Sequence, residues 1–520
     1  MSKMKRTGSL VLAVMLVFTL VLAGCGGSKQ QAASEEKKAE TAAPAAEKKA
    51  DTADAGKAVE LNAYFLAPQV KDLPLVQEEI NKELKAKINA TVKLNYFFWD
   101  SYQDKQRLVI ASGEPIDVMF APSWWGFSNY VAQKAFQPLD DLLAKHGKDI
   151  VANIHPAYLK APKFDGVLYG IPTAKDMTGV GGVLVNKALA EKYNFDFSTV
   201  KTPKDFEPMF KVIKEKEPGV VPFLSTKGDQ MVYFMQNFYE ILCSVEVPVS
   251  MRKSADKVEV VNVYEQPEFI EAVKMSREWY NKGYINKDSA TIQDGMPIKK
   301  AQKAFMWAEQ LKPGKAEEME AQLGYKVLQF NAYADVKPFA NTNDLTNSML
   351  AIPRTAKNPD KAMAFINELF VNKKLKNLMS WGIEGKHYKK IGENQIDFAD
   401  GVNAQNSGYT GMAQWSMGGN QFLDYLWANE SPDKWKKMKE FNDSAVISKT
   451  VGWIFNQDPV KTEVAALNTV GKNLGEPLAR GVVDYDTHYP KVKAALEKAG
   501  IKKVIDEAQK QANDFIAKNK

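Results

Sequence analysis

Residues 59–98 read VELNAYFLAPQVKDLPLVQEEINKELKAKINATVKLNYFF and change their hydrophobic period twice. Apolar side chains occupy every second position of 59–65, which is typical of a half-buried strand. Residues 73–88 then place apolar side chains three and four positions apart, the spacing of one helix face. Residues 91–98 alternate again. This order of strand, helix and strand predicts a βαβ unit with parallel strands.

The same pattern continues with a helix at 102–111 and a third short strand at 116–120. In parallel sheets of this kind, ligands bind beyond the carboxyl ends of the strands. Those ends carry Tyr64-Phe65, Trp99-Asp100 and Ser123-Trp124-Trp125. We therefore expect a binding site rich in aromatic side chains at this edge.

Strand and helix patterns recur further along the chain. We predict strands at 182–185 and 349–352, helices at 268–281 and from Pro359, and two helices around Gly500. The chain has 520 residues, of which 45% are hydrophobic and 25% charged, as in a soluble globular protein. At roughly 100–200 residues per domain, this length predicts two or three domains.

The residue composition excludes several classes of site. Two Cys residues are too few for a disulfide framework or a thiolate zinc site, and the four His residues are scattered (His146, His155, His387 and His488). The sequence has no GxxxxGK[ST] phosphate-binding loop. We therefore expect no metal and no cofactor, and no motif singles out a catalytic residue.

The net charge gives no support for nucleic-acid binding. The formal charge of +6 includes Lys3, Lys5 and Arg6, which precede an apolar run; without them 66 basic residues face 63 acidic ones. The basic residues are mostly Lys and form no Arg-rich patch. A balanced surface of this kind is usually just solvated.

The N-terminus predicts a lipid anchor outside the cytoplasm. The apolar run Leu10–Ala23 is shorter than the roughly 20 residues that span a bilayer, so residues 1–24 read as a signal peptide. The run ends in Leu22-Ala23-Gly24-Cys25, which resembles the bacterial lipobox and implies lipidation of Cys25. Residues 25–57 hold no large apolar residue after Cys25 and predict a disordered tether. Cys243, in an apolar stretch, is expected to be a buried thiol without a disulfide partner.

The order of motifs along the chain resembles the extracellular solute-binding lipoproteins of ABC importers, in the maltodextrin-binding-like group known as family 1. The resemblance rests on the lipobox, the tether, Ile116-Asp117-Val118, Gly170-Ile171-Pro172, Asn186-Lys187, Ala351-Ile352-Pro353 and Asn358-Pro359-Asp360-Lys361-Ala362. The C-terminal third is similar to a Gram-positive subgroup with a distinctive C-terminal region of unassigned function. That similarity rests on residues 381–388, 419–422, 439–442 and 458–463.

This resemblance implies an α/β fold of the type II periplasmic-binding-protein kind. Such a fold has two lobes, each a mixed sheet flanked by helices, joined by crossover strands. We assign residues 58–175 plus 340–400 to the N-terminal lobe and residues 176–339 plus 401–520 to the C-terminal lobe. The resemblance also implies a monomer, held at the cell membrane by its lipid, that closes on a sugar or oligosaccharide and delivers it to two ABC permease subunits.

A sugar binder needs aromatic platforms for apolar C–H faces and polar side chains for hydroxyl groups. Position along the chain selects the candidates. They are the residues at strand ends, beside the expected hinge, and in the Gly-rich stretch 408–421, where we expect a loop. The predicted ligand-binding residues are Trp99, Asp100, Trp124, Trp125, Lys175, Asp176, Trp307, Glu309, Trp381, Glu384, Trp415, Asn420 and Gln421. We expect Trp279, Trp435 and Trp453 to be structural.

Three alternatives remain at this stage. The first is a lipid-anchored glycoside hydrolase, for which two carboxylates would suffice, although no motif singles out a pair. The second is a surface protein that binds sugar without transport. The third is a binding lipoprotein for a peptide, a polyamine or another non-sugar solute.

Overall fold

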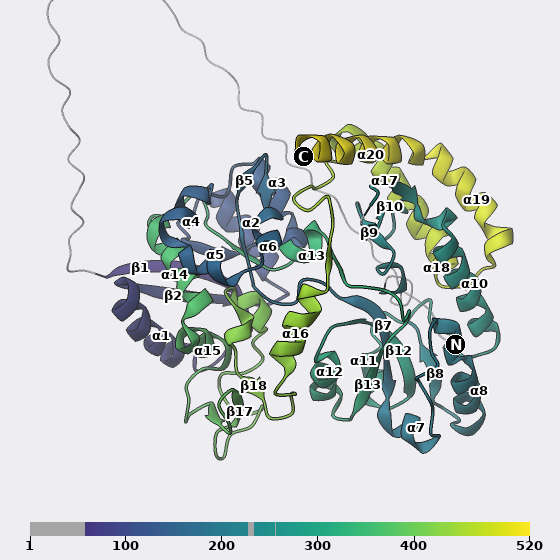
Figure 1. The fold of residues 1–520 in the computed structure, drawn as a ribbon, viewed down its shortest axis with the longest axis horizontal. Helices are drawn as coiled ribbons and strands as arrows, with labels where there is room; N and C mark the ends of the chain where they lie inside the picture. Colours follow the sequence, from purple (N-terminus) through teal and green to yellow (C-terminus); the bar gives the residue numbers. More distant parts are fainter. Residues whose placement is uncertain (1–57, 227–232, 255, 520) are drawn as a thin grey trace, which may run out of the picture. The chain divides into compact units, whose positions relative to one another are not determined.

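The computed structural model describes residues 58–226, 233–254 and 256–519 (Figure 1). The predicted signal peptide, the lipidated Cys25 and the predicted tether lie outside these residues. No helix in the described part of the chain is long and apolar enough to cross a membrane.

The first lobe is built on a five-stranded mixed sheet with the strand order β2-β1-β3-β15-β6. The strand β1 pairs in parallel with β2 and β3, which confirms the predicted βαβ units. The strand β15 runs antiparallel to both β3 and β6. The strands are β1 (Val59–Leu66), β2 (Ala90–Phe97), β3 (Val118–Phe120), β15 (Met349–Ala351) and β6 (Ile171–Pro172).

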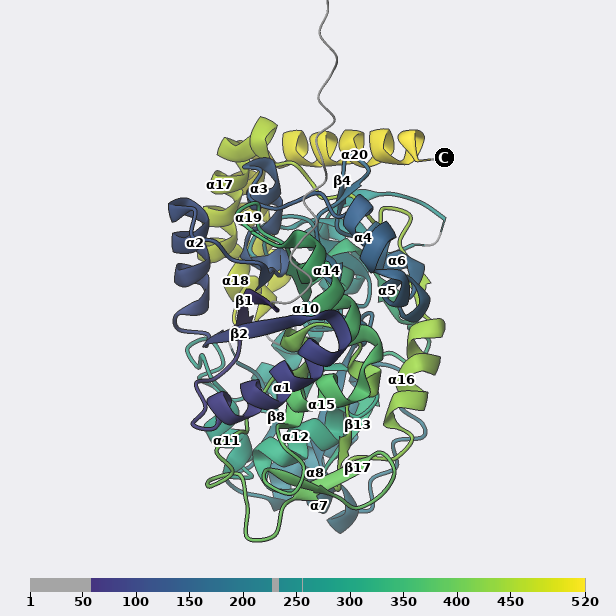
Figure 2. The ribbon, with the colours of Figure 1, turned by 90° about the vertical axis from the view of Figure 1, so that its left-hand side faces the viewer.

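Helices cover both faces of this sheet. On one face α1 (Leu73–Ile88), α14 (Pro359–Val371) and α15 (Lys373–Trp381) pack together over β1 and β2 (Figure 2). On the other face lie α2 (Tyr102–Ser112) and α3 (Phe127–Ala132), separated by a cavity described below. The lobe also contains the 3-10 turn η1 (Ser123–Trp125), α4 (Asp140–His146), α5 (Lys148–Asn153), α6 (Pro156–Lys160), β4 (Lys163–Phe164), β5 (Val167–Leu168) and α13 (Thr342–Thr346).

The second lobe holds two sheets. The four-stranded sheet has the order β13-β7-β12-β8, and the three-stranded sheet has the order β11-β10-β9. The strands of the first are β13 (Val327–Asn331), β7 (Val180–Asn186), β12 (Ala304–Leu311) and β8 (Val221–Leu224); those of the second are β11 (Val260–Asn262), β10 (Val249–Arg252) and β9 (Tyr239–Ile241). The helices and turns before residue 330 are α7 (Lys187–Lys192), η2 (Pro203–Phe206), α8 (Glu207–Lys216), η3 (Val263–Glu265), α10 (Pro267–Asn281), α11 (Met296–Lys300) and α12 (Lys315–Leu323).

The C-terminal region is part of the core of the second lobe. Its helices are α17 (Lys461–Val470), α18 (Glu476–Ala479), α19 (Tyr485–Lys498) and α20 (Ile501–Lys518), with the turns η6 (Asp458–Val460) and η7 (Gly471–Gly475). Leu467 and Val504 are fully buried in one cluster with Val249 of β10. The amide of Gln509 accepts from Val260 N at 2.8 Å and donates to Val258 O at 3.1 Å, which fastens α20 to the three-stranded sheet (Figure 1). The two helices predicted around Gly500 are confirmed.

The chain passes between the two large sheets three times. It runs from β6 to β7, back from β13 through β14 (Phe339–Ala340) and α13 to β15, and forward again through α16 (Lys434–Asp443). The last passage ends in β19 (Val446–Ile447), which pairs in parallel with β14. Between β15 and α16 lie α14, α15, β16 (Tyr388–Lys390), β17 (Gln395–Phe398), η4 (Gln414–Met417), η5 (Gln421–Leu423) and β18 (Leu426–Trp427).

The third passage begins later in the chain than the lobe boundary predicted at residue 400. Tyr409, Met412 and Met417 are buried in the core of the first lobe, with Leu350 and Leu369. Their apolar side chains have no spacing that ties them to either lobe, so the sequence alone misplaced them. The chain therefore stays in the first lobe at least through β18, which pairs with β17.

A group of buried and half-buried charged side chains lies beside the first and second passages. The carboxylate of Asp344 accepts from the Thr178 hydroxyl at 3.3 Å and from Asn341 N at 3.2 Å. Glu240 on β9 is 5% exposed, and among the described residues its Oε2 has no hydrogen-bond partner. Burial, with a further contribution from Asp344, raises the pKa of Glu240 to about 8, while Lys253 opposes the shift. Glu240 therefore holds its proton in the folded protein over a wider pH range than in the unfolded chain.

We expect Leu467→Ala to lower the free energy of unfolding by about 2–5 kcal/mol, because it opens a cavity in the shared core. Lys510→Ala on the exposed side of α20 is the control and should change it by less than about 0.5 kcal/mol. Urea titration followed by circular dichroism measures both. Equal stability of the two variants would show that the C-terminal region does not share the lobe core.

We expect Glu240→Gln to be more stable than the wild type at high pH, with a difference that grows as pH rises. A carboxyl whose pKa is raised on folding loses stability as pH climbs from its unfolded value near 4.5 through about 8. Gln cannot ionise, so the variant and the wild type should melt together at about pH 5. The variant should melt at a higher temperature at about pH 9. A melting difference that does not change with pH would contradict the shift.

Candidate functional site

A cavity of about 1190 Å³ is lined by residues of both lobes. The first lobe contributes Phe98 and Trp99 from the loop after β2, together with much of the segment 380–430. The first passage contributes Asp176, and the second lobe contributes the end of β12 and the start of α12. The predicted edge beyond the carboxyl end of β2 is therefore part of this wall.

Tryptophan is concentrated at this cavity. Five of the ten Trp residues of the chain line it: Trp99, Trp381, Trp415, Trp427 and Trp435. Trp99 is 49% exposed, which is unusual for so large an apolar side chain unless it serves contact with another molecule. The faces of these rings suit the apolar C–H surface of a sugar.

Trp99 is held by three other tryptophans. Its ring stacks on Trp124 at 5.7 Å between centroids with the planes 27° apart, and it lies 5.8 Å from Trp125 and 6.0 Å from Trp415. Trp124 donates from Nε1 to Asn347 O at 2.8 Å, and Trp125 stacks on Tyr102 at 5.3 Å. Neither Trp124, which is 43% exposed, nor Trp125 lines the large cavity in the described structure, so this predicted pair contacts Trp99 beside the cavity rather than within it.

The Gly-rich stretch 408–421 forms the predicted loop, and it brings Trp415 and Gln421 to the cavity. Gly419 has φ +74°, and a Cβ there would lie 2.4 Å from Leu369 O. Only glycine allows this close approach to α14. The loop is further fixed by Gln421 N, which donates to Ala174 O at 2.9 Å, and by the Thr173 hydroxyl, which donates to Trp415 O at 3.1 Å.

Alternating charges follow one wall of the cavity, and we call them the charge chain: Lys175, Asp176, Lys312, Glu318, Lys434 and Glu430. The successive nitrogen–oxygen distances are 3.2, 3.1, 3.3, 3.5 and 2.5 Å. Burial opposes ionisation of Asp176, but Lys175 and Lys312 outweigh it and hold the pKa of the carboxyl well below its usual range. The charge chain joins the first passage, β12, α12 and the start of α16.

Asp424 supplies a second buried carboxylate in the cavity wall. It accepts from the Ser380 hydroxyl at 2.8 Å and pairs with Lys376 at 3.2 Å, and both of these partners are almost fully buried. Burial raises the pKa of Asp424 to about 6, although Lys376 and Ser380 favour the ionised form. The backbone oxygen of Asp424 also accepts from Trp435 Nε1 at 2.8 Å, which orients that ring.

Besides Trp124 and Trp125, six predicted residues do not line the cavity in the described structure. Trp307 is 1% exposed because it stands in the middle of β12 rather than at its end, under α11 and α12. Glu309 pairs with Lys315 at 3.6 Å, and Glu384 pairs with Lys390 at 2.8 Å on the surface. Asp100 accepts from the Ser101 hydroxyl. Asn420 caps η5 through Phe422 N. Lys175 is 7% exposed and reaches the cavity only through Asp176.

Several lining residues escaped the sequence prediction. The predicted set lacks Trp427, and the Lys-rich helix around Trp435 predicts a structural role for that ring, yet both line the cavity. His387 also lines the cavity: its Nδ1 accepts from Ile383 N at 2.8 Å, so Nε2 carries the proton toward Asp72 at 3.2 Å. None of these positions has a sequence signal beyond residue type, since their approach to the cavity depends on passages of the chain that are distant in sequence.

Chemically, the cavity is equipped for binding. It offers aromatic faces, planar amides (Gln310, Gln414, Gln421) and fixed charges. Within the described ranges no group of three or more His, Cys, Asp or Glu side chains could hold a metal ion.

We expect Asp176→Asn to lower the free energy of unfolding by about 3–5 kcal/mol, because Lys175 and Lys312 would lose their shared counter-ion in a buried place. The loss should be full at about pH 5 and above, since a carboxyl with a lowered pKa gives up its stabilisation only as pH falls through that pKa. Asp397→Asn, an exposed carboxylate lining the same cavity, is the control. Equal thermal melting of the two variants would show that the charge chain contributes nothing.

Two sequence families match the chain. Residues 79–383 match the family described as bacterial extracellular solute-binding protein, and residues 449–517 match a domain of unknown function (DUF3502). The second match covers the helices that complete the core of the second lobe.

One curated protein resembles the chain over most of its length, and a second over less than half of it. A carbohydrate ABC transporter substrate-binding protein of Streptococcus pneumoniae is 31% identical over 90% of this chain and 93% of its own length. The lipoprotein LipO of Bacillus subtilis is 23% identical over 45% of this chain and 46% of its own.

Among solved structures, the N-glycan transport solute-binding protein NgtS of Streptococcus pneumoniae is 27% identical. One crystal structure of NgtS covers 89% of this chain and 100% of its own, with a TM-score of 0.80. The complex of NgtS with Man5GlcNAc covers 89% and 99%, with a TM-score of 0.65. The fold is thus the two-lobed fold of NgtS, and the first family match alone spans more than half of the 520 residues. The chain belongs to the bacterial extracellular solute-binding proteins, a family that binds solutes and does not transform them.

Proposed function

We propose that the protein captures an oligosaccharide outside the membrane and delivers it to an ABC permease. The observation that carries this proposal is the concentration of five Trp residues on one cavity that also holds amides and charged groups. Aromatic faces and planar polar side chains together match the amphipathic surface of a sugar. The names of the similar proteins, a carbohydrate ABC transporter substrate-binding protein and an N-glycan transport protein, support the same ligand class.

The size of the cavity favours a chain of several sugar units. Sites for ligands of drug size measure roughly 300–1,000 Å³, and this cavity measures about 1190 Å³. A single monosaccharide would leave most of the tryptophans without contact. We therefore propose an oligosaccharide rather than a simple sugar.

The charge pattern favours a neutral ligand over a polyamine or a charged peptide. The lining carboxylates Asp176, Glu318 and Glu430 are paired with Lys312 or Lys434 in the charge chain. Asp424 is paired with Lys376. A polycation would have to compete with these internal lysines for each of these four carboxylates, whereas hydroxyl groups can bind to paired charges without separating them.

Capture is proposed to proceed by closure of the lobes. An oligosaccharide that touches Trp99 of the first lobe and Gln310 of the second lobe binds best when both reach it, so it favours the closed arrangement. The permease would then recognise the closed form.

The anchor and the site of action complete the proposal. Lipidation of Cys25 would hold the protein on the outer face of the cell membrane, with residues 26–57 as a tether and the protein acting as a monomer beside two permease subunits. The similarity to LipO, a lipoprotein, supports the anchor.

Titration of intrinsic tryptophan fluorescence with Man5GlcNAc tests this function, with kestose and tri-lysine as comparison ligands. We expect saturable binding of at least one of the two glycans and none of tri-lysine. Trp99→Ala should weaken glycan binding by about tenfold, since an aromatic contact is worth roughly 0.5–1.5 kcal/mol beyond burial and tenfold corresponds to about 1.4 kcal/mol.

Trp99→Phe keeps an aromatic face and should recover part of the affinity. Leu108→Ala, at an exposed position of α2 that lines neither cavity, is the control and should bind as wild type. Binding of tri-lysine in place of both glycans would reject the carbohydrate assignment. Full affinity of Trp99→Ala would reject Trp99 as a platform.

A further inference from the structure

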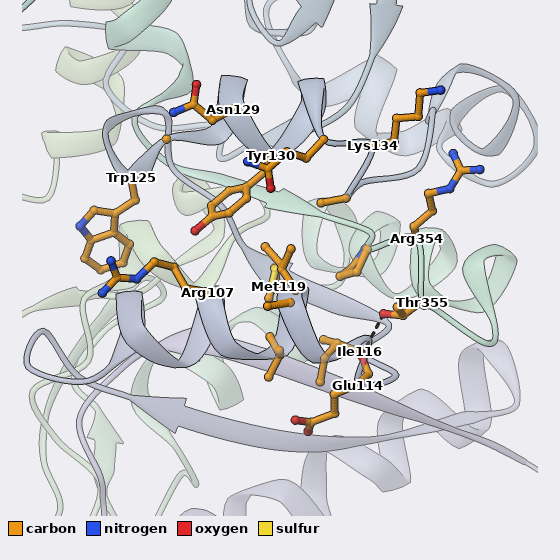
Figure 3. A pocket seen from close by; sticks show the side chains of 17 residues that line it. Arg107, Glu114, Ile116, Met119, Trp125, Asn129, Tyr130, Lys134, Arg354 and Thr355 are labelled. Atoms are coloured by element: carbon orange, nitrogen blue, oxygen red, sulfur yellow. Dashed lines mark hydrogen bonds between the residues drawn. The ribbon is translucent and has the colours of Figure 1, made fainter. Parts of the chain in front are cut away.

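The first lobe carries a second cavity, of about 580 Å³, that is separate from the proposed glycan site. It lies between α2, α3 and the segment 353–355 that follows β15 (Figure 3). Here the sheet face is covered only in part, so the cavity reaches down to Ile116 and Met119, which are otherwise buried in the lobe core.

The floor of this second cavity is apolar and its rim is positive. Ile116, Met119 and Pro353 belong to the buried floor, whereas Arg107, Lys134 and Arg354 are exposed. Figure 3 shows Arg107 beside Trp125 at one end, and Lys134 and Arg354 at the other. The positive charge therefore lies at both ends of an apolar hollow.

The positive charge of the rim is not neutralised by its own neighbours. Glu114 is the one carboxylate in the wall, and it is already occupied: it accepts from the Tyr64 hydroxyl at 2.7 Å and pairs with Lys105 at 3.3 Å. In the described part of the chain no carboxylate lies within ion-pair distance of Lys134 or Arg354. Arg107 pairs with Asp104, but both are exposed, and exposed pairs are weak.

Trp125 connects the second cavity to the proposed glycan site. One edge of the Trp125 indole lines the second cavity, and its ring lies 5.8 Å from Trp99, which lines the large one. A molecule seated in the second cavity would thus touch a side chain that directly contacts a proposed glycan platform.

We infer that this second cavity is the docking site for an acidic, amphipathic segment of the partner permease; this inference rests on the proposed function. Apolar side chains of the segment would fill the hollow above Met119, and its carboxylates would pair with Arg107, Lys134 and Arg354. The three cations are exposed and spread over both ends, which suits an extended surface segment with several carboxylates better than one small anion. Their charge would also attract the permease segment before contact.

The test uses the triple variant Arg107→Gln/Lys134→Gln/Arg354→Gln in proteoliposomes that contain the permease. The control is Lys71→Gln/Lys85→Gln/Lys87→Gln, three exposed lysines of the same lobe on or beside α1. Glycan affinity, measured by fluorescence titration with Man5GlcNAc or whichever glycan the wild type binds, should stay within twofold in both variants. Glycan-dependent ATP hydrolysis by the permease should fall at least tenfold in the rim variant and stay unchanged in the control.

A photocrosslinking amino acid at Gln133, inside the second cavity, identifies the occupant. A product with a permease subunit that is lost in the rim variant supports the inference. A product with a second copy of this chain, or wild-type ATP hydrolysis by the rim variant, overturns it. Failure of the proposed function is distinguishable, since the wild-type protein would then neither bind glycan nor stimulate the permease.

Discussion

The site depends most on the ion pairs that the Asp176 carboxylate makes with two lysines. This carboxylate lies on the first passage between the lobes and joins Lys175 of that passage to Lys312 at the end of β12. From there the charge chain reaches α12 and the start of α16, so one largely buried carboxylate links the first and third passages of the chain and a wall of the cavity. Ion pairs of this kind are sensitive to the loss of one partner, because the other is left buried and unpaired.

The aromatic wall of the cavity consists of rings that can contact a ligand and of rings that support them. Trp99 is exposed at the cavity, and the rings of Trp124 and Trp125 contact it from outside the cavity lining. A rigid platform loses less conformational freedom when a ligand binds, so the supporting rings raise the affinity without touching the ligand. The same arrangement places Trp125 against the second cavity, which gives a short physical connection between the proposed glycan site and the proposed docking site.

The C-terminal region has a structural explanation. Its helices bury Leu467 and Val504 against the three-stranded sheet and complete a core that would otherwise face water. Residues 449–517 are therefore a part of the second lobe rather than a domain attached to it. These residues supply the helices that cover the three-stranded sheet of the second lobe.

The sequence by itself determined the local elements, the βαβ units and the class of residue at the site. The hydrophobic period predicts strands and helices from neighbouring residues, and with them the strand ends. Trp99 follows such an end, so the sequence predicts it as a site residue. The tertiary structure alone decided that Trp307 is a core residue, that residues 409–417 belong to the first lobe, and that Trp427 and Trp435 line the cavity. These outcomes depend on contacts between segments far apart in the chain, such as Gly419 with Leu369, and no local spacing encodes which distant surface a side chain will meet.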